Sequence, residues 1–354
     1  MKLKHLVLAV MSVSILIVGT LASKAASNAK AQKSGAHASA TKTKKPAAQS
    51  RKVASSSKSG TSTRKAKSTP VSTRATPAKP LDTDFDTVGN PQLSSSAFVV
   101  QDVNSGEILL EKNAHAAVPI ASITKLMTVM VVLDAQQSLS EVLEITNDDV
   151  DRLKGTSSRL TLGTRLSREE LMLLALMSSE NRAASSLARH YPGGMTAFLE
   201  AVKVKARLMG LADTHIYDGT GLNKDNVSSA RDLATLVANA SRYPLIREFS
   251  TREEYIVRVG AKRTLTYRNT NSLVSSPDWQ IDVSKTGYIS ESGRCLVMQA
   301  WLGDKPLAIV LLDSWGRYTR VADAQRIRKW LENVAAHKPS PLVFEDQLAT
   351  TLAN

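Results

Sequence analysis

The chain has 354 residues, which is more than one compact domain usually needs, and a formal net charge of +14. The charge is uneven: residues 1–90 hold 16 of the 46 basic residues and 3 of the 32 acidic ones, so the remainder is nearly neutral. No aromatic residue precedes Phe85. The basic segment therefore lacks the aromatic side chains on which bases stack, and we expect no nucleic-acid partner.

Residues 1–26 have the pattern of a secretory signal peptide. Lys2 and Lys4 precede an apolar run over residues 6–21, and small residues such as Ala22 follow. A basic start, a short apolar segment and small residues at its end are typical of such peptides. An uncleaved membrane anchor is the alternative, although the run is shorter than the roughly 20 residues of a span. Both interpretations predict that the rest of the chain is exported.

Residues 27–89 are predicted to be a disordered, basic, low-complexity linker. They consist mainly of Ala, Ser, Thr, Lys and Pro, and residues 24–80 contain 14 Lys or Arg and no Asp or Glu. Such a segment cannot bury enough apolar surface to offset its chain entropy. It is either a solvated spacer or a tether that contacts anionic components of the cell envelope.

The folded domain is assigned to residues 90–336, and residues 337–354 to a short C-terminal tail. Strand-like runs at 97–102 and 107–111 flank an Asn-Ser-Gly hairpin signal. Residues 122–135 follow as a helix that is apolar nearly all round, which indicates a buried helix.

A helical block comes next, and the pattern then returns to strands. Ser167 and Glu170 form a capping-box signal, and Ser228 or Ser229 is the expected N-cap of a later helix. Gly303 and Asp304 predict a hairpin turn. The expected helices are 171–177, 181–190, 197–209, 230–240 and 317–334, and the expected strands are 255–259, 264–267, 281–285, 295–302 and 306–312. This order predicts an α+β fold with one antiparallel sheet flanked by helices and an all-α subdomain.

Residue types that commonly bind metals, such as cysteine and histidine, are few in this sequence. Cys295 is the only cysteine and lies in an apolar run, so we expect it to be a small buried hydrophobe. The six histidines form no His-x-x-x-His pair, which argues against a metallopeptidase. We expect neither a metal nor another cofactor.

The first chemical motif is Ser122-Ile123-Thr124-Lys125. At the start of a helix, positions i and i+3 lie about 5–6 Å apart on one face, so the Lys125 amine can reach the Ser122 hydroxyl. A serine hydroxyl is a weak nucleophile until a neighbouring base takes its proton. Ser-x-x-Lys also occurs four times between residues 27 and 65, but only Ser122 opens a buried apolar helix.

Two further motifs follow in order along the chain. Ser179-Glu180-Asn181 falls between two predicted helices, where Ser179 can relay a proton and the Asn181 amide can hold a carbonyl group. The alternative is that Ser179 only caps the following helix. Lys285-Thr286-Gly287 ends a predicted strand. Its cation and hydroxyl suit a carboxylate, and its glycine allows close approach to the backbone.

These three motifs, in this order and these settings, resemble those of penicillin-binding proteins and serine β-lactamases. The resemblance covers roughly residues 90–336 and implies the β-lactamase/transpeptidase-like fold. Gly221-Leu222 and the run from Ser229 to Ala234 are similar to the DD-peptidase branch. The implied ligands are peptidoglycan stem peptides, with β-lactam antibiotics as covalent inhibitors.

The resemblance implies a role for each motif residue. Ser122 resembles the acylated nucleophile, Lys125 its base and Ser179 the proton shuttle to the leaving amine. Asn181 would position the substrate amide. Lys285, Thr286 and Gly287 would bind the terminal D-Ala end of the substrate, and Arg320 resembles an arginine that assists there in some members. The oxyanion hole would use the backbone N–H groups of Ser122 and Tyr288.

The identity of the acylation base stays open in this family. A neutral Lys125 requires a lowered pKa, and we expect the charge of Lys285 to supply that shift.

Glu180 stands where many relatives have Asp, Ser or Gly. The run from Ser179 to Ala184 is similar to the penicillin-binding protein 7 type, the periplasmic D-alanyl-D-alanine endopeptidases. The resemblance therefore implies a periplasmic serine peptidase that cleaves peptidoglycan cross-links. A D-Ala-D-Ala carboxypeptidase with the same site is the alternative.

Two other functions are less favoured. A class A β-lactamase uses a glutamate that activates water, and the segment around residues 215–218 offers no equivalent. A β-lactam sensor that stays acylated would need transmembrane helices, and no such apolar run follows residue 21.

Overall fold

A computed structural model describes residues 84–86, 89–260 and 263–336. The predicted signal peptide, nearly all of the predicted linker and the C-terminal tail at 337–354 lie outside these residues. Within the described ranges, no helix is both long and apolar enough to cross a membrane.

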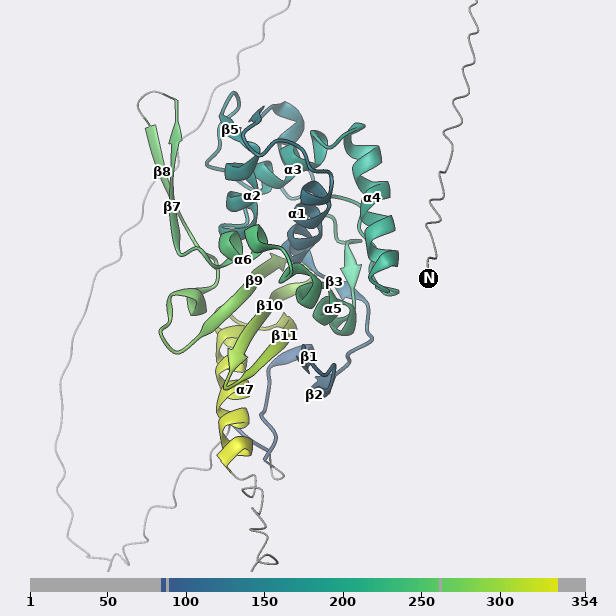
Figure 1. The fold of residues 1–354 in the computed structure, drawn as a ribbon, viewed down its shortest axis with the longest axis vertical. Helices are drawn as coiled ribbons and strands as arrows, with labels where there is room; N and C mark the ends of the chain where they lie inside the picture. The colour runs from purple at the N-terminus through teal and green to yellow at the C-terminus, as the bar shows by residue number, and fades with distance from the viewer. Residues whose placement is uncertain (1–83, 87–88, 261–262, 337–354) are drawn as a thin grey trace, which may run out of the picture. The chain divides into compact units, whose positions relative to one another are not determined.

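A five-stranded antiparallel sheet forms the centre of the domain (Figure 1). Its strand order is β2-β1-β11-β10-β9, so strands from the two ends of the domain pair at its centre. Leu302 opposes Lys305 across the β10–β11 turn, which confirms the predicted hairpin. The strands are β1 (Ser95–Asp102), β2 (Ile108–Lys112), β9 (Gln280–Ile289), β10 (Gly293–Leu302) and β11 (Lys305–Ser314).

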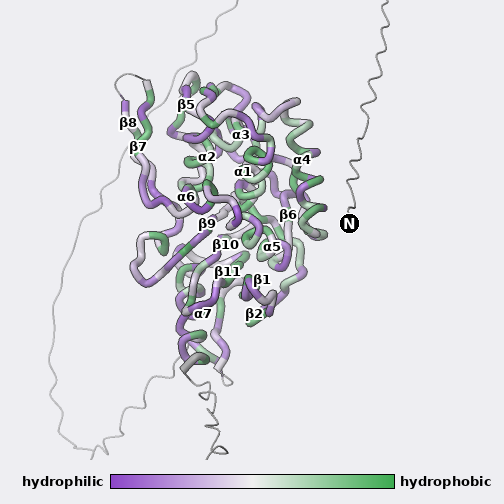
Figure 2. Tube along the Cα trace, in the orientation of Figure 1, coloured by the Kyte–Doolittle hydropathy of each residue, from purple (hydrophilic) through white to green (hydrophobic). Residues whose placement is uncertain are grey.

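Both faces of the sheet are buried, because side chains alternate between the faces and both sets are apolar. In β11, Ala308 and Val310 pack into the core shared with the helical block. Leu307 and Ile309 belong to a second core, which includes Ile327 of the last helix. Figure 2 shows that helix α1 (Thr124–Asp134) is itself largely hydrophobic, as its central position requires.

The helices follow the predicted pattern with one addition. The capping box of Ser167 with Glu170 and the N-cap at Ser229 are both confirmed. The α6 helix, which has Pro244 in its first turn, was not predicted. The helices are α1 (Thr124–Asp134), α2 (Arg168–Met177), α3 (Asn181–Arg189), α4 (Gly194–Leu208), α5 (Ala230–Ala240), α6 (Pro244–Thr251) and α7 (Thr319–Ala336).

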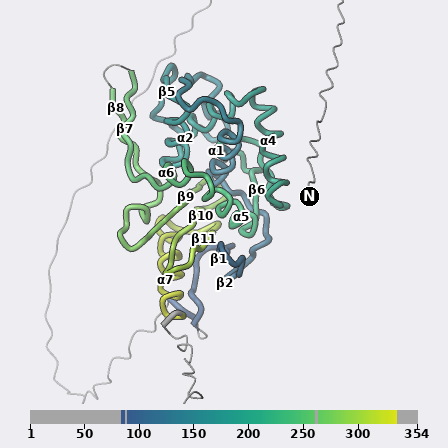
Figure 3. The backbone as a smooth tube through the Cα atoms, in the orientation of Figure 1, coloured from purple at the N-terminus to yellow at the C-terminus, as the bar shows by residue number. Residues whose placement is uncertain are grey.

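The predicted antiparallel sheet flanked by helices is confirmed, but the strands expected at 255–259 and 264–267 do not join it. Strands β7 (Glu254–Val259) and β8 (Arg263–Arg268) form a separate hairpin that extends away from the central sheet (Figures 1 and 3). Its exposed Ile256 and buried Tyr267 show that only part of the hairpin contributes to the core. Two further pairs are short: β3 (Val118–Pro119) with β6 (Val227–Ser228), and β4 (Val142–Glu144) with β5 (Arg165–Ser167).

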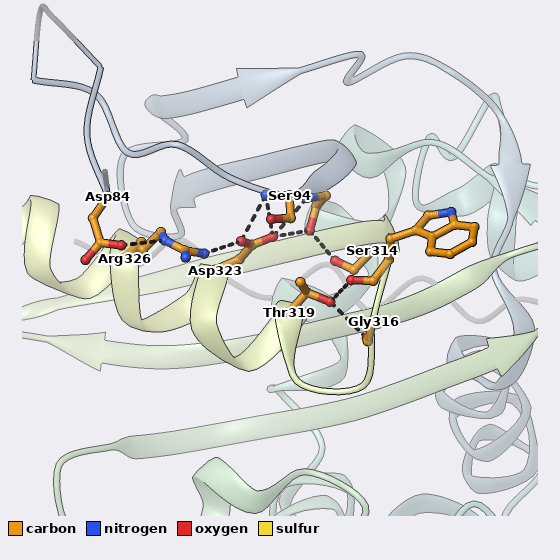
Figure 4. A network of polar contacts seen from close by, with 9 residues as sticks. Asp84, Ser94, Ser314, Gly316, Thr319, Asp323 and Arg326 are labelled. Atoms are coloured by element: carbon orange, nitrogen blue, oxygen red, sulfur yellow. Dashed lines mark hydrogen bonds and ion pairs between the residues drawn. The ribbon is translucent and has the colours of Figure 1, made fainter. Parts of the chain in front are cut away.

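A buried carboxylate joins α7 to the start of β1 (Figure 4). Asp323 is fully buried and accepts hydrogen bonds from the backbone N–H groups of Ser94 and Ser95 and from the Ser95 hydroxyl. Arg326 donates to Asp323 and also to Asp84, so a residue assigned to the linker lies against α7. This network attaches the last helix to the central sheet.

Asp323→Ala is expected to lower the free energy of unfolding by about 2–4 kcal/mol, because it leaves buried donors without an acceptor. Denaturant titration of both proteins measures the change. Glu332→Ala, which removes an exposed partner of Arg328 on the same helix, is the matched control and should cost less than about 1 kcal/mol. Equal effects of the two substitutions would contradict the structural role of Asp323.

Candidate active site

Ser122 lies in a strained turn rather than in the first turn of an α-helix. A 3-10 turn, η1 (Ala121–Ile123), precedes α1, which begins at Thr124, so the predicted helix start at 122 is two residues early. Ala121 has a φ of 48°, a conformation that costs energy for a residue with a side chain. The Thr124 hydroxyl donates to the Ala121 carbonyl, and Asn226 donates to Thr124. These contacts hold the turn in place.

Two glycines allow other segments to pack directly against the backbone of this turn. A Cβ atom on Gly221, which has a φ of +80°, would lie 1.9 Å from the Ala121 carbonyl oxygen. A Cβ atom on Gly287 would lie 2.8 Å from the Ile120 carbonyl oxygen and 3.2 Å from the Ser122 nitrogen. Only glycine permits such an approach. Strand β9 therefore runs alongside the backbone of Ser122.

Lys125 is fully buried beneath Ser122. Its Nζ lies 2.8 Å from the Ser122 hydroxyl, 2.8 Å from Asn181 Oδ1 and 2.6 Å from the carbonyl oxygen of Thr220. Burial lowers the pKa of Lys125 to about 7, against the opposing attraction of two carboxylates, Asp218 and Glu180. The expectation that Lys285 supplies this shift is therefore wrong: desolvation is the dominant cause.

The contacts of Lys125 suit a neutral amine that accepts a proton. The carbonyl oxygens of Asn181 and Thr220 can only accept hydrogen bonds, so they take the two N–H groups of a neutral amine. The remaining lone pair then faces the Ser122 hydroxyl, which donates to it. In this state Lys125 is placed to remove the serine proton.

Ser179 lies beside a second buried lysine. Its φ is 60°, and its hydroxyl accepts a hydrogen bond of 2.9 Å from Lys285 Nζ. Lys285 also donates to the Thr286 carbonyl oxygen. Burial lowers the pKa of Lys285 well below its usual value, and the charges of Lys125 and Arg320 lower it further. A lysine that releases its proton readily next to a serine hydroxyl can serve a proton relay.

The middle residue of the second motif, Glu180, supports the walls of the site. Glu180, not Ser179, is the N-cap of α3, and its carboxylate accepts from the Arg182 backbone N–H. The alternative that Ser179 caps this helix is therefore wrong. The same carboxylate accepts a 2.6 Å hydrogen bond from Ser158 and a 3.5 Å one from the Tyr267 hydroxyl. It thereby connects the loop before β5 to the β7–β8 hairpin.

The predicted site residues meet around one cleft of about 380 Å³. Ser122, Ser179, Asn181, Thr286 and Gly287 line it, while Lys125 and Lys285 contact the two serines from the buried side. The cleft also contains Leu222, which the sequence named only for its resemblance to the DD-peptidase branch, and three residues that the sequence did not single out: Thr156, Thr270 and Arg294.

Two of the unpredicted residues orient predicted ones. Thr156 accepts a 3.0 Å hydrogen bond from the Asn181 amide nitrogen, which leaves the Asn181 oxygen directed at Lys125. The Thr286 hydroxyl donates to Thr270 at 2.7 Å. Neither threonine belongs to a motif, so no spacing in the sequence could have identified them.

Two arginines make one side of the cleft cationic. Arg294 and Arg320 both line it, next to Thr286 and Tyr288. Among the residues that the structure describes, no hydrogen-bond partner exists for the buried Nη1 atom of Arg320. An unpartnered guanidinium nitrogen beside the cleft suits a substrate carboxylate. Arg320 therefore lies at the cleft, where its expected role would require it, and Arg294 lies there with it.

The fold and this arrangement of serines and lysines are those of the penicillin-binding serine peptidases. The family model for peptidase S11, D-alanyl-D-alanine carboxypeptidase, matches residues 84–315. The chain therefore belongs to this family of serine DD-peptidases.

Similar proteins include D-alanyl-D-alanine endopeptidases of two bacteria. The Pseudomonas aeruginosa protein is 46% identical over 242 residues, which cover 68% of this chain and 78% of that one. The Escherichia coli protein is 42% identical over 270 residues, or 75% of this chain and 87% of that one. Among solved structures, the Streptomyces K15 DD-transpeptidase superposes with a TM-score of 0.64 at 27% identity, covering 68% of this chain and 98% of that one.

The acylation rate is expected to rise with pH through about 7 and then level off, because only neutral Lys125 accepts the serine proton. Two pH units below the pKa the neutral fraction, and with it the rate, should fall about 100-fold. Stopped-flow acylation by a β-lactam between pH 5 and 9 measures this profile, with circular dichroism as the check on folding. A flat profile would exclude Lys125 as the base.

Proposed function

We propose that this protein is a D-alanyl-D-alanine endopeptidase that cleaves peptidoglycan cross-links through an acyl-enzyme on Ser122. The observation that carries the proposal is the 2.8 Å contact between the buried Lys125 amine and the Ser122 hydroxyl, at the base of a cleft with a cationic side. The names of the Pseudomonas and Escherichia relatives support endopeptidase action in particular.

Acylation begins when the Ser122 oxygen attacks the carbonyl carbon of the D-Ala residue at the cleavage point. Lys125 takes the hydroxyl proton, and the backbone N–H groups of Ser122 and Tyr288 stabilise the negative oxygen of the tetrahedral intermediate. The C–N bond then breaks, and Ser179 passes to the leaving amine the proton that Lys125 removed from Ser122. In the second step, water attacks the ester carbonyl carbon and gives a proton to the neutral Lys125, and the Ser122–carbonyl bond breaks as that proton returns to the Ser122 oxygen.

The cleft provides separate contacts for the two sides of the scissile bond. Asn181 would position the amide of the acyl donor, since its side chain is fixed between Thr156 and Lys125. The carboxylate next to the leaving amine would lie against Thr286, Arg294 and Arg320. β-lactams carry a carboxylate at the equivalent place, so they would enter the same cleft and acylate Ser122.

The carboxypeptidase alternative uses the same residues. Removal of the terminal D-Ala from a pentapeptide has the same acyl donor, and its leaving group carries the same carboxylate. The description of the family model and the names of more distant relatives, both D-alanyl-D-alanine carboxypeptidase, support this alternative.

The setting of the reaction is also part of the proposal. Residues 1–26 would export the protein to the periplasm, where peptidoglycan lies, and the domain at 90–336 would carry the activity. The basic linker at 27–89 would contact anionic envelope components, or act only as a spacer.

Incubation of the protein with a cross-linked muropeptide dimer and, separately, with a monomeric pentapeptide tests the endopeptidase assignment, with products identified by mass. The dimer is expected to yield monomers at least about tenfold faster than the pentapeptide loses D-Ala. Ser122→Ala should reduce both reactions by about 10³-fold or more, because it removes the nucleophile. Loss of D-Ala from the pentapeptide alone would make the protein a carboxypeptidase.

A further inference from the structure

A second hollow opens directly beside the catalytic cleft. This aromatic groove has a volume of about 290 Å³ and shares Tyr288 and Arg294 with the cleft, so the two hollows are adjacent. Beyond that shared edge it is formed by the turn between β9 and β10, the end of β11 and the turn before α7. The residues that line it are Tyr288, Ser290, Gly293, Arg294, Asp313, Ser314, Trp315, Gly316 and Arg317.

The groove presents an unusual concentration of exposed aromatic and cationic groups. Trp315 is 85% exposed and Tyr288 58% exposed, although large aromatic side chains are normally mostly covered. Arg294 stacks over the Tyr288 ring at 4.7 Å, and Arg317 lies 5.5 Å from the ring of Tyr318, which is itself 70% exposed. Exposed apolar area of this kind next to a catalytic cleft is typical of a binding surface.

The turn that carries Trp315 and Arg317 is held in place. The Thr319 hydroxyl donates to the carbonyl oxygens of Trp315 and Gly316, and Ser314 donates to Ser95, which in turn donates to the buried Asp323. Figure 4 shows these contacts continuing to Arg326 and Asp84. The backbone of the turn is therefore fixed before any ligand arrives, so little of its freedom is lost on binding.

The position of the groove identifies the part of the substrate that would reach it. In the proposed reaction, Thr286, Arg294 and Arg320 would hold the carboxylate on the carbon that bears the leaving amine. In a pentapeptide, that carbon carries only the methyl group of D-Ala. In a cross-link it belongs to a diaminopimelate residue, whose side chain continues into a second stem peptide with further carboxylates.

We propose that the aromatic groove binds the second stem peptide of a cross-link on the leaving-group side of the scissile bond, and so favours cross-linked over monomeric substrate. The proposal rests on the peptidase activity proposed above. Arg294 and Arg317 would pair with the carboxylates of that peptide, and Trp315 would cover its aliphatic portions. Asp313 is the single carboxylate among the lining residues, so cations predominate on this surface.

The test is a double variant, Trp315→Ala with Arg317→Ala, in the full-length protein. Arg294 is left intact because it also lines the catalytic cleft. The second-order rate constant is expected to fall about tenfold for the muropeptide dimer, and to change less than about twofold for the pentapeptide and for acylation by benzylpenicillin. The matched control, Arg207→Ala with Leu208→Ala, removes an exposed cation and an exposed apolar side chain from α4. It should leave all three constants unchanged.

Two results would overturn the proposal: an unchanged rate for the dimer, or an equal fall for all three substrates, which would indicate a structural effect. A binding measurement separates this failure from failure of the proposed function. Calorimetry with the Ser122→Ala protein should show the dimer binding more tightly than the pentapeptide, and the double substitution should remove that difference. If the wild-type protein does not cleave the dimer, the endopeptidase function fails, and this binding comparison alone decides the role of the groove.

Discussion

Three segments that are far apart in the sequence meet at the amine of Lys125. It contacts the Ser122 turn, Asn181 at the start of α3 and the carbonyl oxygen of Thr220. A buried ammonium is costly, so burial shifts the lysine toward its neutral form. The same contacts therefore hold the three segments around the cleft together and keep Lys125 in a buried position, where its lowered pKa lets it act as the base. This double role explains why the lysine lies inside the domain while the serine faces the cleft.

The backbone around the nucleophile depends on this packing. Ala121 adopts an unfavourable conformation that the local sequence would not choose, and the surrounding segments keep it there. Gly221 and Gly287 make room for that turn from two directions. Consequently β9 approaches Ser122 closely enough to line the same cleft, and the motif residues come from a turn, a helix start and a strand. The aromatic groove lies next to this cleft, at the end of the sheet formed by β9, β10 and β11, where we propose that the leaving group passes.

Local signals in the sequence predicted much of the fold. The capping box at Ser167 and the turn at Gly303 are short-range patterns with direct physical causes, and the apolar strands β9 to β11 follow from composition. The sequence placed β7 and β8 in the central sheet, whereas they pair only with each other. Whether a hairpin joins a distant sheet depends on long-range pairing, which no local pattern in the sequence reports. Thr270 was missed for a similar reason: it belongs to no motif, and only the fold brings its hydroxyl next to Thr286. The cause of the Lys125 pKa shift was misjudged because burial of one amine cannot be read from a motif.

Covalent labelling tests the central claim most directly. After reaction with benzylpenicillin and digestion with trypsin, mass spectrometry should find the penicilloyl adduct on the peptide of residues 113–125, in which Ser122 is the only serine. Ser179 falls in a separate peptide, residues 169–182. An adduct confined to 113–125, and absent from the Ser122→Ala protein, is the predicted result. An adduct on 169–182, or labelling that persists in Ser122→Ala, would contradict the account of a serine nucleophile activated by a buried lysine.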